Sequence, residues 1–310
     1  MQKAYLTALY DLLKRDRNAV YLLSDSGTDY DNLLFREFPN QCYNLGICEQ
    51  HQVAVAAGMA ICGKIPFIYT TGAFLAYRAY EFIRNDVCVQ NLNVKIIGMG
   101  SGLSWSTLGN SHHTTEDIAA LRALPNLTLL SPASPIEMRA ALDASYQLMG
   151  PVYIRMGMSN EKEIYEDDYC FVIGMNQVIR EGDDIAIFTT GSIIGDMLET
   201  VNMLRDDGVS AQLVNVPTLK PFDASGTIAM CGKFRNIFSV EEHNVIGGLG
   251  SILSEIICDN SINTKLKKIG LNDCFAKGYG NHLQIKALNG LDAKSVHKTI
   301  NNFLKGSTYE

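Results

Sequence analysis

The chain has 310 residues, of which 47% are hydrophobic and 19% are charged, and its formal net charge is −7 at pH 7. This length allows two ordinary domains, each with its own hydrophobic core. Acidic and basic residues are mixed along the chain without a basic block, which argues against a nucleic-acid partner, because phosphates need clustered lysine and arginine.

The beginning of the chain, MQKAYLTALYDLLKRDR, predicts an amphipathic helix rather than a signal peptide, because polar residues interrupt its apolar positions. No run of about 18 apolar residues occurs, so no membrane span is expected. The eight cysteines form no CxxC pair, and five of them lie in or beside apolar segments, namely Cys42, Cys48, Cys62, Cys88 and Cys258. We expect reduced thiols that serve as small core residues in a cytoplasmic protein, and no metal site.

Up to residue 157, apolar runs alternate with helix-like segments. Strands are expected at 19–25, 65–71, 94–100, 127–134 and 151–157, and helices at 51–63, 73–90, 115–124 and 135–149. Strands that alternate with helices in this way predict parallel βαβ units whose sheet is covered on both faces.

Residues 158–180 are more charged and break this alternation, so we place the domain junction there. A second alternating set follows, with strands at 184–192, 209–217, 236–242 and 265–271 and helices at 194–208, 247–259 and 292–306. The predicted fold class is therefore α/β with two domains, each a mostly parallel sheet flanked by helices. The predicted divisions are a domain at 1–160, a linker at 161–180 and a domain at 181–310.

Several common catalytic motifs are absent from the sequence. It contains neither the GxxxxGK[ST] motif of a P-loop nor the GxSxG elbow of many serine hydrolases. The sequence GGLG at 247–250 lacks the spacing of a dinucleotide fingerprint. Its glycines either contact a ligand or allow a helix to pack closely.

Glu49 stands in NLGICEQHQVAVAAGMA, at the beginning of an apolar helix. One interpretation is an acid in the first turn, which gains up to about 1 kcal/mol from the helix dipole. The other is a carboxyl group that exchanges a proton with a ligand nitrogen.

Two further segments carry candidate site residues. His112 and His113 lie in the polar loop LGNSHHTTED, which faces a ligand, caps the next helix through Thr114 or Thr115, or does both. Arg155 ends the apolar strand PVYIRMG, where its guanidinium pairs with a buried acid or binds an anion.

The segment NLGICEQHQVAVAAGMAICGKIPFIYT resembles the GxxEQ segment of the transketolase family, which includes deoxyxylulose-phosphate synthase. The similarity continues through GNSHHTTEDIAALRALPNLTLLSPAS, GPVYIRMG, VNVPTLKPFD and SVEEHNVIGGLGSILSE. It covers nearly the whole chain and implies a thiamine-diphosphate pyrimidine-binding fold followed by the transketolase C-terminal domain. The family's GDG…N motif, which holds Mg²⁺ and the cofactor's diphosphate, does not occur in this sequence.

The resemblance implies one subunit of a split transketolase, which transfers a two-carbon ketol unit between sugars. The partner subunit would carry the GDG…N domain and hold Mg²⁺. Because the family places its cofactor between two protomers, we expect a homodimer of this chain at the centre of an α2β2 assembly.

The resemblance also implies roles for particular residues. Glu49 matches the glutamate that bonds N1′ of the cofactor's aminopyrimidine, and Phe74 falls where an aromatic ring stacks on that pyrimidine. Arg78 follows one turn later, and Asp25 matches an acid near the cofactor and the subunit contact. His112 matches a catalytic histidine that faces the substrate. In the same way, His113 is expected to line the substrate site, and Arg155 matches an arginine that binds the substrate's phosphate.

Two departures from the family pattern concern the substrate. Leu108 replaces an acid that reads a sugar hydroxyl, and Gly100 replaces a histidine. Since leucine cannot accept a hydrogen bond from a hydroxyl group, we expect a non-standard sugar. Two alternatives are a decarboxylating acyl transfer from pyruvate, as in deoxyxylulose-phosphate synthase, whose double histidine the chain shares, and a non-catalytic partner subunit.

Overall fold

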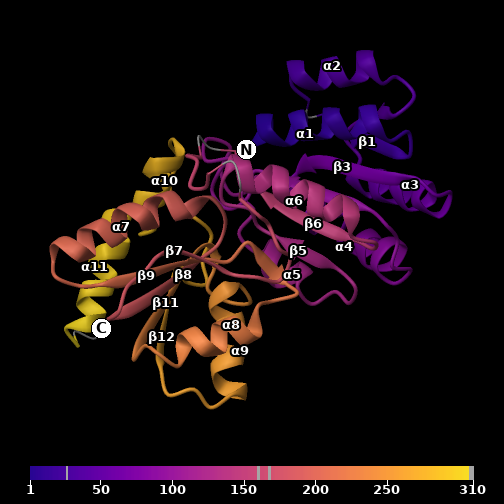
Figure 1. Ribbon diagram of the computed structural model, residues 1–310. Helices are drawn as coiled ribbons and strands as arrows, with labels where there is room; N and C mark the ends of the chain where they lie inside the picture. The colour runs from indigo at the N-terminus through magenta and orange to yellow at the C-terminus, as the bar shows by residue number, and fades with distance from the viewer. Residues whose placement is uncertain (26, 159–160, 167–168, 307–310) are drawn as a thin grey trace.

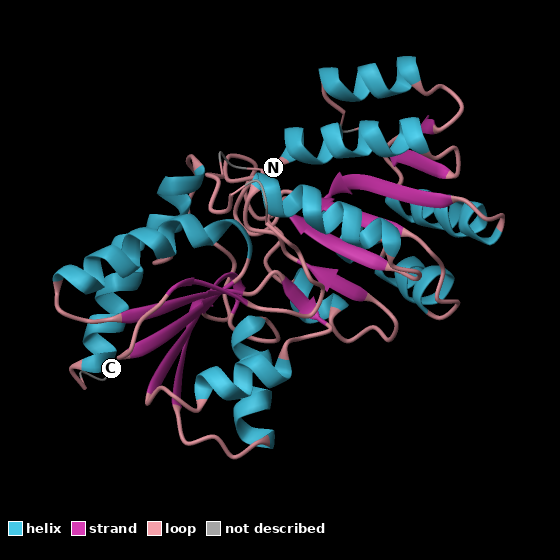
Figure 2. Ribbon diagram, in the orientation of Figure 1, coloured by secondary structure: helices cyan, strands magenta, loops and turns pink. Residues whose placement is uncertain are grey.

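The computed structural model describes residues 1–25, 27–158, 161–166 and 169–306. Two sheets lie side by side, one built mainly from the first half of the chain and one from the second, and helices flank both (Figures 1 and 2). The predicted fold class, α/β with two mostly parallel sheets, is confirmed.

The first sheet has the strand order β10-β5-β6-β4-β3-β1-β2, and only the pair β10 and β5 is antiparallel. Its strands are β1 (Ala19–Leu23), β2 (Cys42–Asn44), β3 (Ile65–Thr71), β4 (Lys95–Met99), β5 (Thr128–Leu130), β6 (Val152–Met156) and β10 (Thr218–Lys220). The edge strand β10 comes from the second half of the chain. The domain limits at 160 and 180 remain predictions, but the first sheet is completed by residues beyond them.

Helices cover both faces of this sheet. One face packs against α1 (Gln2–Arg15), α2 (Asp29–Glu37) and α6 (Pro135–Gln147). The other packs against α3 (Glu49–Ile61), η1 (Phe74–Arg78), α4 (Tyr80–Phe82), η2 (Ile83–Cys88) and α5 (Asp117–Leu121). Successive strand residues point to opposite faces, so Tyr21 joins the first of these cores and Leu22 the second.

The second sheet has the order β12-β11-β8-β9-β7, with β7 antiparallel to β9. Its strands are β7 (Gln177–Arg180), β8 (Ile185–Thr189), β9 (Ala211–Asn215), β11 (Asn236–Asn244) and β12 (Lys265–Leu271). Its helices are η3 (Gly191–Ile193), α7 (Ile194–Asp206), α8 (Ala224–Cys231), α9 (Leu249–Asp259), α10 (His282–Leu288) and α11 (Ala293–Leu304). Figure 1 shows α7 and α11 on the opposite side of this sheet from α8 and α9.

Local sequence explains most of these elements. All five residues of β1, β4, β6, β8 and β9 are buried, as expected for parallel strands covered on both faces. Helix α6 begins after Ser134, whose hydroxyl accepts a hydrogen bond from the backbone N–H of Glu137, and Pro135 occupies its first turn. The predicted amphipathic helix at the beginning of the chain forms α1.

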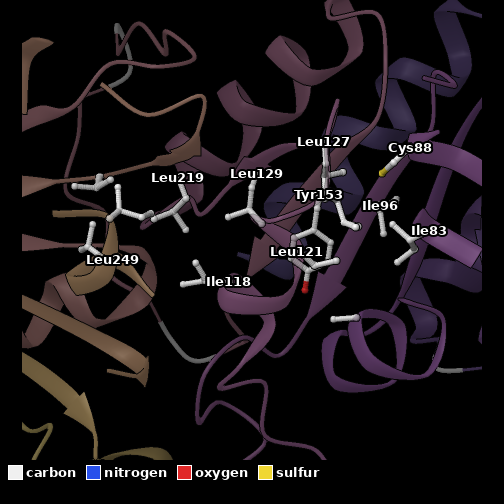
Figure 3. Close-up of a cluster of buried hydrophobic side chains, with 14 of the residues drawn as sticks. Ile83, Cys88, Ile96, Ile118, Leu121, Leu127, Leu129, Tyr153, Leu219 and Leu249 are labelled. Carbon is white, nitrogen blue, oxygen red and sulfur yellow. The ribbon is translucent and has the colours of Figure 1, made fainter. Parts of the chain in front are cut away.

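One hydrophobic core continues from the first sheet into the second (Figure 3). Leu219 and Leu249, from the second half of the chain, lie in the same cluster as Ile118 and Leu129 from the first half. This shared burial fixes the two sheets relative to each other and holds the loops between them in place.

Two predictions differ from the structure. The single helix expected at 73–90 is divided into two π-helical segments and a short α-helix, and Ala79 interrupts the helical backbone at φ −99° and ψ 12°. Among the cysteines expected in the core, Cys42 and Cys88 are buried and Cys48 is partly buried, but Cys62 and Cys258 are exposed.

Candidate active site at the carboxyl edge of the first sheet

The candidate residues follow the carboxyl ends of neighbouring parallel strands. Glu49 follows β2, Phe74 and Arg78 follow β3, and the loop with His112 and His113 follows β4. Ligands of open α/β sheets bind at this edge, because loops from adjacent strands meet there.

Glu49 is the first residue of α3, and only 1% of its surface is exposed. It does not cap its helix, since the N-cap residue is Cys48 and no side-chain cap is formed. Its Oε2 accepts a 2.7 Å hydrogen bond from Nη1 of Arg78, and no other hydrogen bond of this carboxylate occurs within the described residues. The carboxylate is therefore held by one cation, with Oε1 left for another partner.

Arg78, Phe74 and His112 form a row of side chains next to Glu49. The Arg78 guanidinium lies 4.6 Å from the centre of the Phe74 ring, which is within the range of a cation–π contact. The His112 ring also contacts Phe74, with the two ring centres 4.9 Å apart and the planes at 66°. The structure thus brings together four residues that are far apart in the sequence.

An open pocket of about 460 Å³ lies beside this row. It is lined by Ala73, Phe74, Tyr77, Arg78, Asn110, Ser111, His113, Glu116 and Phe275. Phe275 was not predicted from the sequence; it comes from the loop after β12 of the second sheet and is 71% exposed. The position of this loop at a strand's carboxyl end was the available signal, since such loops gather at one edge.

The two histidines differ in their surroundings. Nδ1 of His112 lies 2.9 Å from Oγ of Ser111, and burial lowers the pKa of this imidazole. His113 is 3% exposed, and Nδ1 of its ring lies 3.2 Å from Oδ1 of Asn110. Burial also lowers its pKa, and its buried Nε2 has no hydrogen-bond partner among the described residues.

The alternative in which this loop only caps the next helix through a threonine is wrong, because the N-cap of α5 is Glu116. Glu116 is tied to η1 instead, since Tyr77 donates a 2.9 Å hydrogen bond to its carboxylate and accepts one from its backbone N–H. The histidine loop is therefore fastened to the segment that carries Phe74 and Arg78.

Arg155 shows the first of its two predicted arrangements, a pairing with a buried acid. Its Nε donates to both carboxylate oxygens of Asp117 at 3.0 Å, and its Nη2 donates to the backbone oxygens of Thr114 and Glu242 at 3.0 and 2.8 Å. Arg155 is 2% exposed and does not line the pocket. Its contact with a substrate phosphate stays a prediction that this closed arrangement does not favour.

Asp25 lies apart from the pocket, just beyond the end of β1. It is exposed, its φ is 51°, and its carboxylate accepts a 3.2 Å hydrogen bond from the Asn44 side chain. It lines a separate hollow of about 290 Å³ between β1, β2 and α2. Its role near the cofactor remains a prediction.

The glycines at 247–250 face the protein's own carboxylate. Both oxygens of Glu241 accept hydrogen bonds from the N–H groups of Leu249 and Gly250 at the beginning of α9, at 2.7 and 2.9 Å. This favours the interpretation that these glycines allow close packing. In the described part of the chain, no group of three histidine, cysteine, aspartate or glutamate side chains is placed to hold a metal, and no helix is long and apolar enough to cross a membrane.

Comparison with known protein families identifies the family of this chain. Residues 1–162 match the transketolase pyrimidine-binding domain, and residues 174–296 match the transketolase C-terminal domain. The chain belongs to the transketolase family. It consists of the pyrimidine-binding and C-terminal domains, as the sequence analysis expected.

Individual relatives agree with this assignment. The chain is 36% identical over 261 residues to one of the subunits of apulose-4-phosphate transketolase from Actinobacillus succinogenes, a match that covers 84% of each chain. It is 30% identical over 298 residues to a 6-deoxy-6-sulfo-D-fructose transketolase subunit of Clostridium sp., covering 96% of this chain and 92% of that one. A solved structure described as a split gene transketolase, inactive beta4 tetramer, matches with a TM-score of 0.88 and 34% identity over 99% of this chain and 98% of that one.

Proposed function

We propose that this chain is the pyrimidine-binding subunit of a split, thiamine-diphosphate-dependent transketolase that transfers a two-carbon ketol unit between a ketose and an aldose. The observation that carries the proposal is Glu49, a buried carboxylate at the carboxyl edge of a parallel sheet, next to an aromatic pocket. Thiamine diphosphate supplies the carbon chemistry when it is bound.

The residues of this chain fit the aminopyrimidine part of that cofactor. A planar heterocycle with ring nitrogens needs an aromatic surface and a buried acid, and Phe74 and Glu49 supply these groups within one row. The 460 Å³ pocket beside them has the size of a small-molecule site. The chain offers no set of acidic ligands for Mg²⁺ among its described residues, so the partner subunit would hold the ion and the diphosphate.

Each residue has a distinct task in this proposal. Glu49 would hold the ring nitrogen of the bound pyrimidine and exchange a proton with it through Oε1, the oxygen that Arg78 leaves unused. Phe74 orients the ring. His113 lines the pocket, and His112, on the same loop after β4, packs against Phe74. We assign to His112 the task of bonding the substrate and moving a proton, and to His113 that of lining the substrate site.

The substrate that we propose is a non-standard sugar. Leu108 is 47% exposed, and neither it nor Gly100 has a side chain that can accept a hydrogen bond from a sugar hydroxyl. The names of two relatives specify apulose-4-phosphate and 6-deoxy-6-sulfo-D-fructose as the sugars on which they act. These names support an uncommon ketose as the donor or product of this chain.

The assembly that we propose is an α2β2 heterotetramer with a homodimer of this chain at its centre. The chain holds only one half of the site, and the relative solved without activity is described as a tetramer of β chains. All eight cysteines are free thiols, which agrees with the cytoplasmic location that we propose.

The test is reconstitution with a subunit that carries the GDG…N motif, in the presence of thiamine diphosphate and Mg²⁺. We expect ketol transfer from a ketose only when both chains are present, with greater activity on a deoxy or branched ketose phosphate than on xylulose 5-phosphate. Labelled pyruvate is the control, because the double histidine also occurs in deoxyxylulose-phosphate synthase. Release of CO₂ would replace the proposal with acyl transfer, and a stable complex without activity would favour a structural subunit.

A further inference from the structure

The site after β4 contains an aromatic residue to which neither the sequence analysis nor the family comparison assigned a role. Gly100 has φ +81°, and a Cβ atom added to it would lie 2.1 Å from Nε1 of Trp105. This separation is far shorter than any real contact, and the neighbour is a rigid ring. The indole therefore occupies the space that a side chain at position 100 would need.

The same indole contacts the histidine of the proposed site. The ring centres of Trp105 and His112 lie 6.4 Å apart with the planes at 69°, and Phe74 meets His112 at 4.9 Å and 66°. His112 is thus bounded by two aromatic rings, each in an edge-on arrangement that aromatic pairs favour.

This arrangement leaves one nitrogen of His112 available. Nδ1 lies 2.9 Å from Oγ of Ser111, whereas Nε2 takes part in no hydrogen bond within the described ranges. Two rings that limit the rotation of the imidazole and one hydroxyl that occupies Nδ1 select Nε2 as the nitrogen that meets a ligand. The titratable neighbours are His113 on the same loop and the Arg78–Glu49 pair, whose guanidinium contacts the Phe74 ring.

We infer that Trp105 is a positioning residue: it fills the space above Gly100 and holds the His112 imidazole against Phe74 with Nε2 directed to the substrate. The role in catalysis rests on the proposed function, whereas the contact between the two rings does not. Gly100 and Trp105 act as a pair, since any side chain at position 100 would displace the indole and release His112.

The contact can be measured in the chain alone, because Trp105 is its single tryptophan. A protonated imidazole in contact with an indole quenches its fluorescence. We expect the emission to fall as the pH is lowered, with a midpoint below the ordinary value of about 6.5 because burial lowers the pKa of His112. The transition should be absent in His112→Gln and retained in His113→Gln, the matched control. A transition that persists in His112→Gln, or that is missing from the parent chain, would overturn the inference.

The positioning role has its own readout. We expect Trp105→Leu to raise the pKa of His112, measured by NMR, towards its ordinary value, because the imidazole gains water, and Trp105→Phe to leave it nearly unchanged. In the assembled enzyme, Trp105→Leu should lower kcat/KM by roughly tenfold or more, and Trp105→Phe by less than about threefold. An unchanged pKa in Trp105→Leu, or equal kinetic losses in both variants, would contradict positioning. If no substrate is turned over, the proposed function fails, while fluorescence and NMR still decide the contact.

Discussion

The carboxyl edges of the two sheets both carry glutamate and histidine side chains, but those of the first sheet lie near an open pocket and those of the second are enclosed in the protein. At the first sheet, the Glu49 carboxylate is bonded to one half-exposed arginine, Arg78, which lines an open pocket. At the second sheet, β11 carries Glu241, Glu242 and His243 just before its last residue, and all three are buried and hydrogen-bonded inside the protein. Glu241 binds the beginning of α9, and Glu242 binds the Leu103 N–H and His282.

This difference shows that a buried carboxylate in an α/β protein is not by itself a sign of chemistry. What separates the two edges is the number of partners that each carboxylate already has. Glu241 accepts a hydrogen bond on each oxygen, and Glu242 accepts two on Oε2, with its Oε1 enclosed in the protein and unpartnered among the described residues. Glu49 accepts one hydrogen bond, from an arginine that is half-exposed, and keeps Oε1 for a ligand. The second edge therefore supports the histidine loop on which the first edge depends.

The largest expected effect is that of Glu49→Gln on activity. Glutamine still accepts the hydrogen bond from Arg78 but cannot exchange a proton, so we expect the turnover of the assembled enzyme to fall by about 10²–10⁴-fold. The thermal midpoint of unfolding should change little. Turnover and differential scanning calorimetry on the same preparation measure both quantities.

The matched control is Glu241→Gln, the same substitution at the equivalent edge of the second sheet. It removes the charge that two N–H groups of α9 bind, so we expect a loss of roughly 1–3 kcal/mol in the free energy of unfolding. Turnover of the folded protein should remain near that of the parent. If both variants lost activity equally, the distinction between the two edges would be wrong.

The next effect concerns the closed pair of Arg155 and Asp117. Arg155→Met leaves the Asp117 carboxylate buried and without its cation, so we expect a loss of about 3–5 kcal/mol in the free energy of unfolding, measured by urea denaturation. The double variant Arg155→Met with Asp117→Asn should recover part of this loss. A stable single variant whose KM for a phosphorylated sugar rises would instead support the phosphate-binding prediction.

Features that depend on a few neighbouring residues can be predicted from the sequence, whereas contacts between residues far apart in the chain cannot. Strand β3 and helix α6 follow from local patterns, namely a run of apolar residues and a serine cap followed by proline. The partner of Arg155 could not be chosen from sequence, because Asp117 and Glu242 lie 38 and 87 residues away. Tertiary packing determines which loops meet at the edge of a sheet, and this cannot be predicted from a local sequence pattern.

The site shows the same limit. Glu49, Phe74, Arg78 and His112 were predicted from the family resemblance, and the structure brings them together, although their roles remain proposals. Trp105 was missed because its function depends on the empty space above Gly100. A glycine in a sequence does not show which residue fills the space beside it, so the pairing of Gly100 with Trp105 needs the structure.

A smaller effect is the acid sensitivity that Glu242 confers on the second edge. Burial alone would raise the pKa of this carboxyl, but the pairing with His282 lowers it to about 2, below its ordinary value of 4.5. The folded state therefore binds fewer protons than the unfolded state between these values. The stabilisation is complete above pH 4.5 and is lost as the pH falls from 4.5 towards 2.

We expect no more than about 3 kcal/mol of the free energy of unfolding to be lost over this range. Glu242→Gln should be less stable than the parent at pH 6 and should lose less stability on acidification. Urea unfolding at a series of pH values from 6 to 3 measures both curves. Parallel curves would show that Glu242 does not titrate in this window.

The smallest effect on stability is expected for Arg78, the cation of the open edge. Its side chain is 42% exposed although Glu49 is buried, so water can take the place of the guanidinium beside the carboxylate. We therefore expect Arg78→Met to lower the free energy of unfolding by about 1 kcal/mol, well below the loss in Arg155→Met. Arg155→Met removes the same kind of group from a fully buried pair. Measuring both variants therefore compares the open pair with the closed pair directly. If both substitutions destabilised the protein equally, Glu49 would be as fully engaged as Asp117, and the open oxygen on which the proposed chemistry depends would not be available to a ligand.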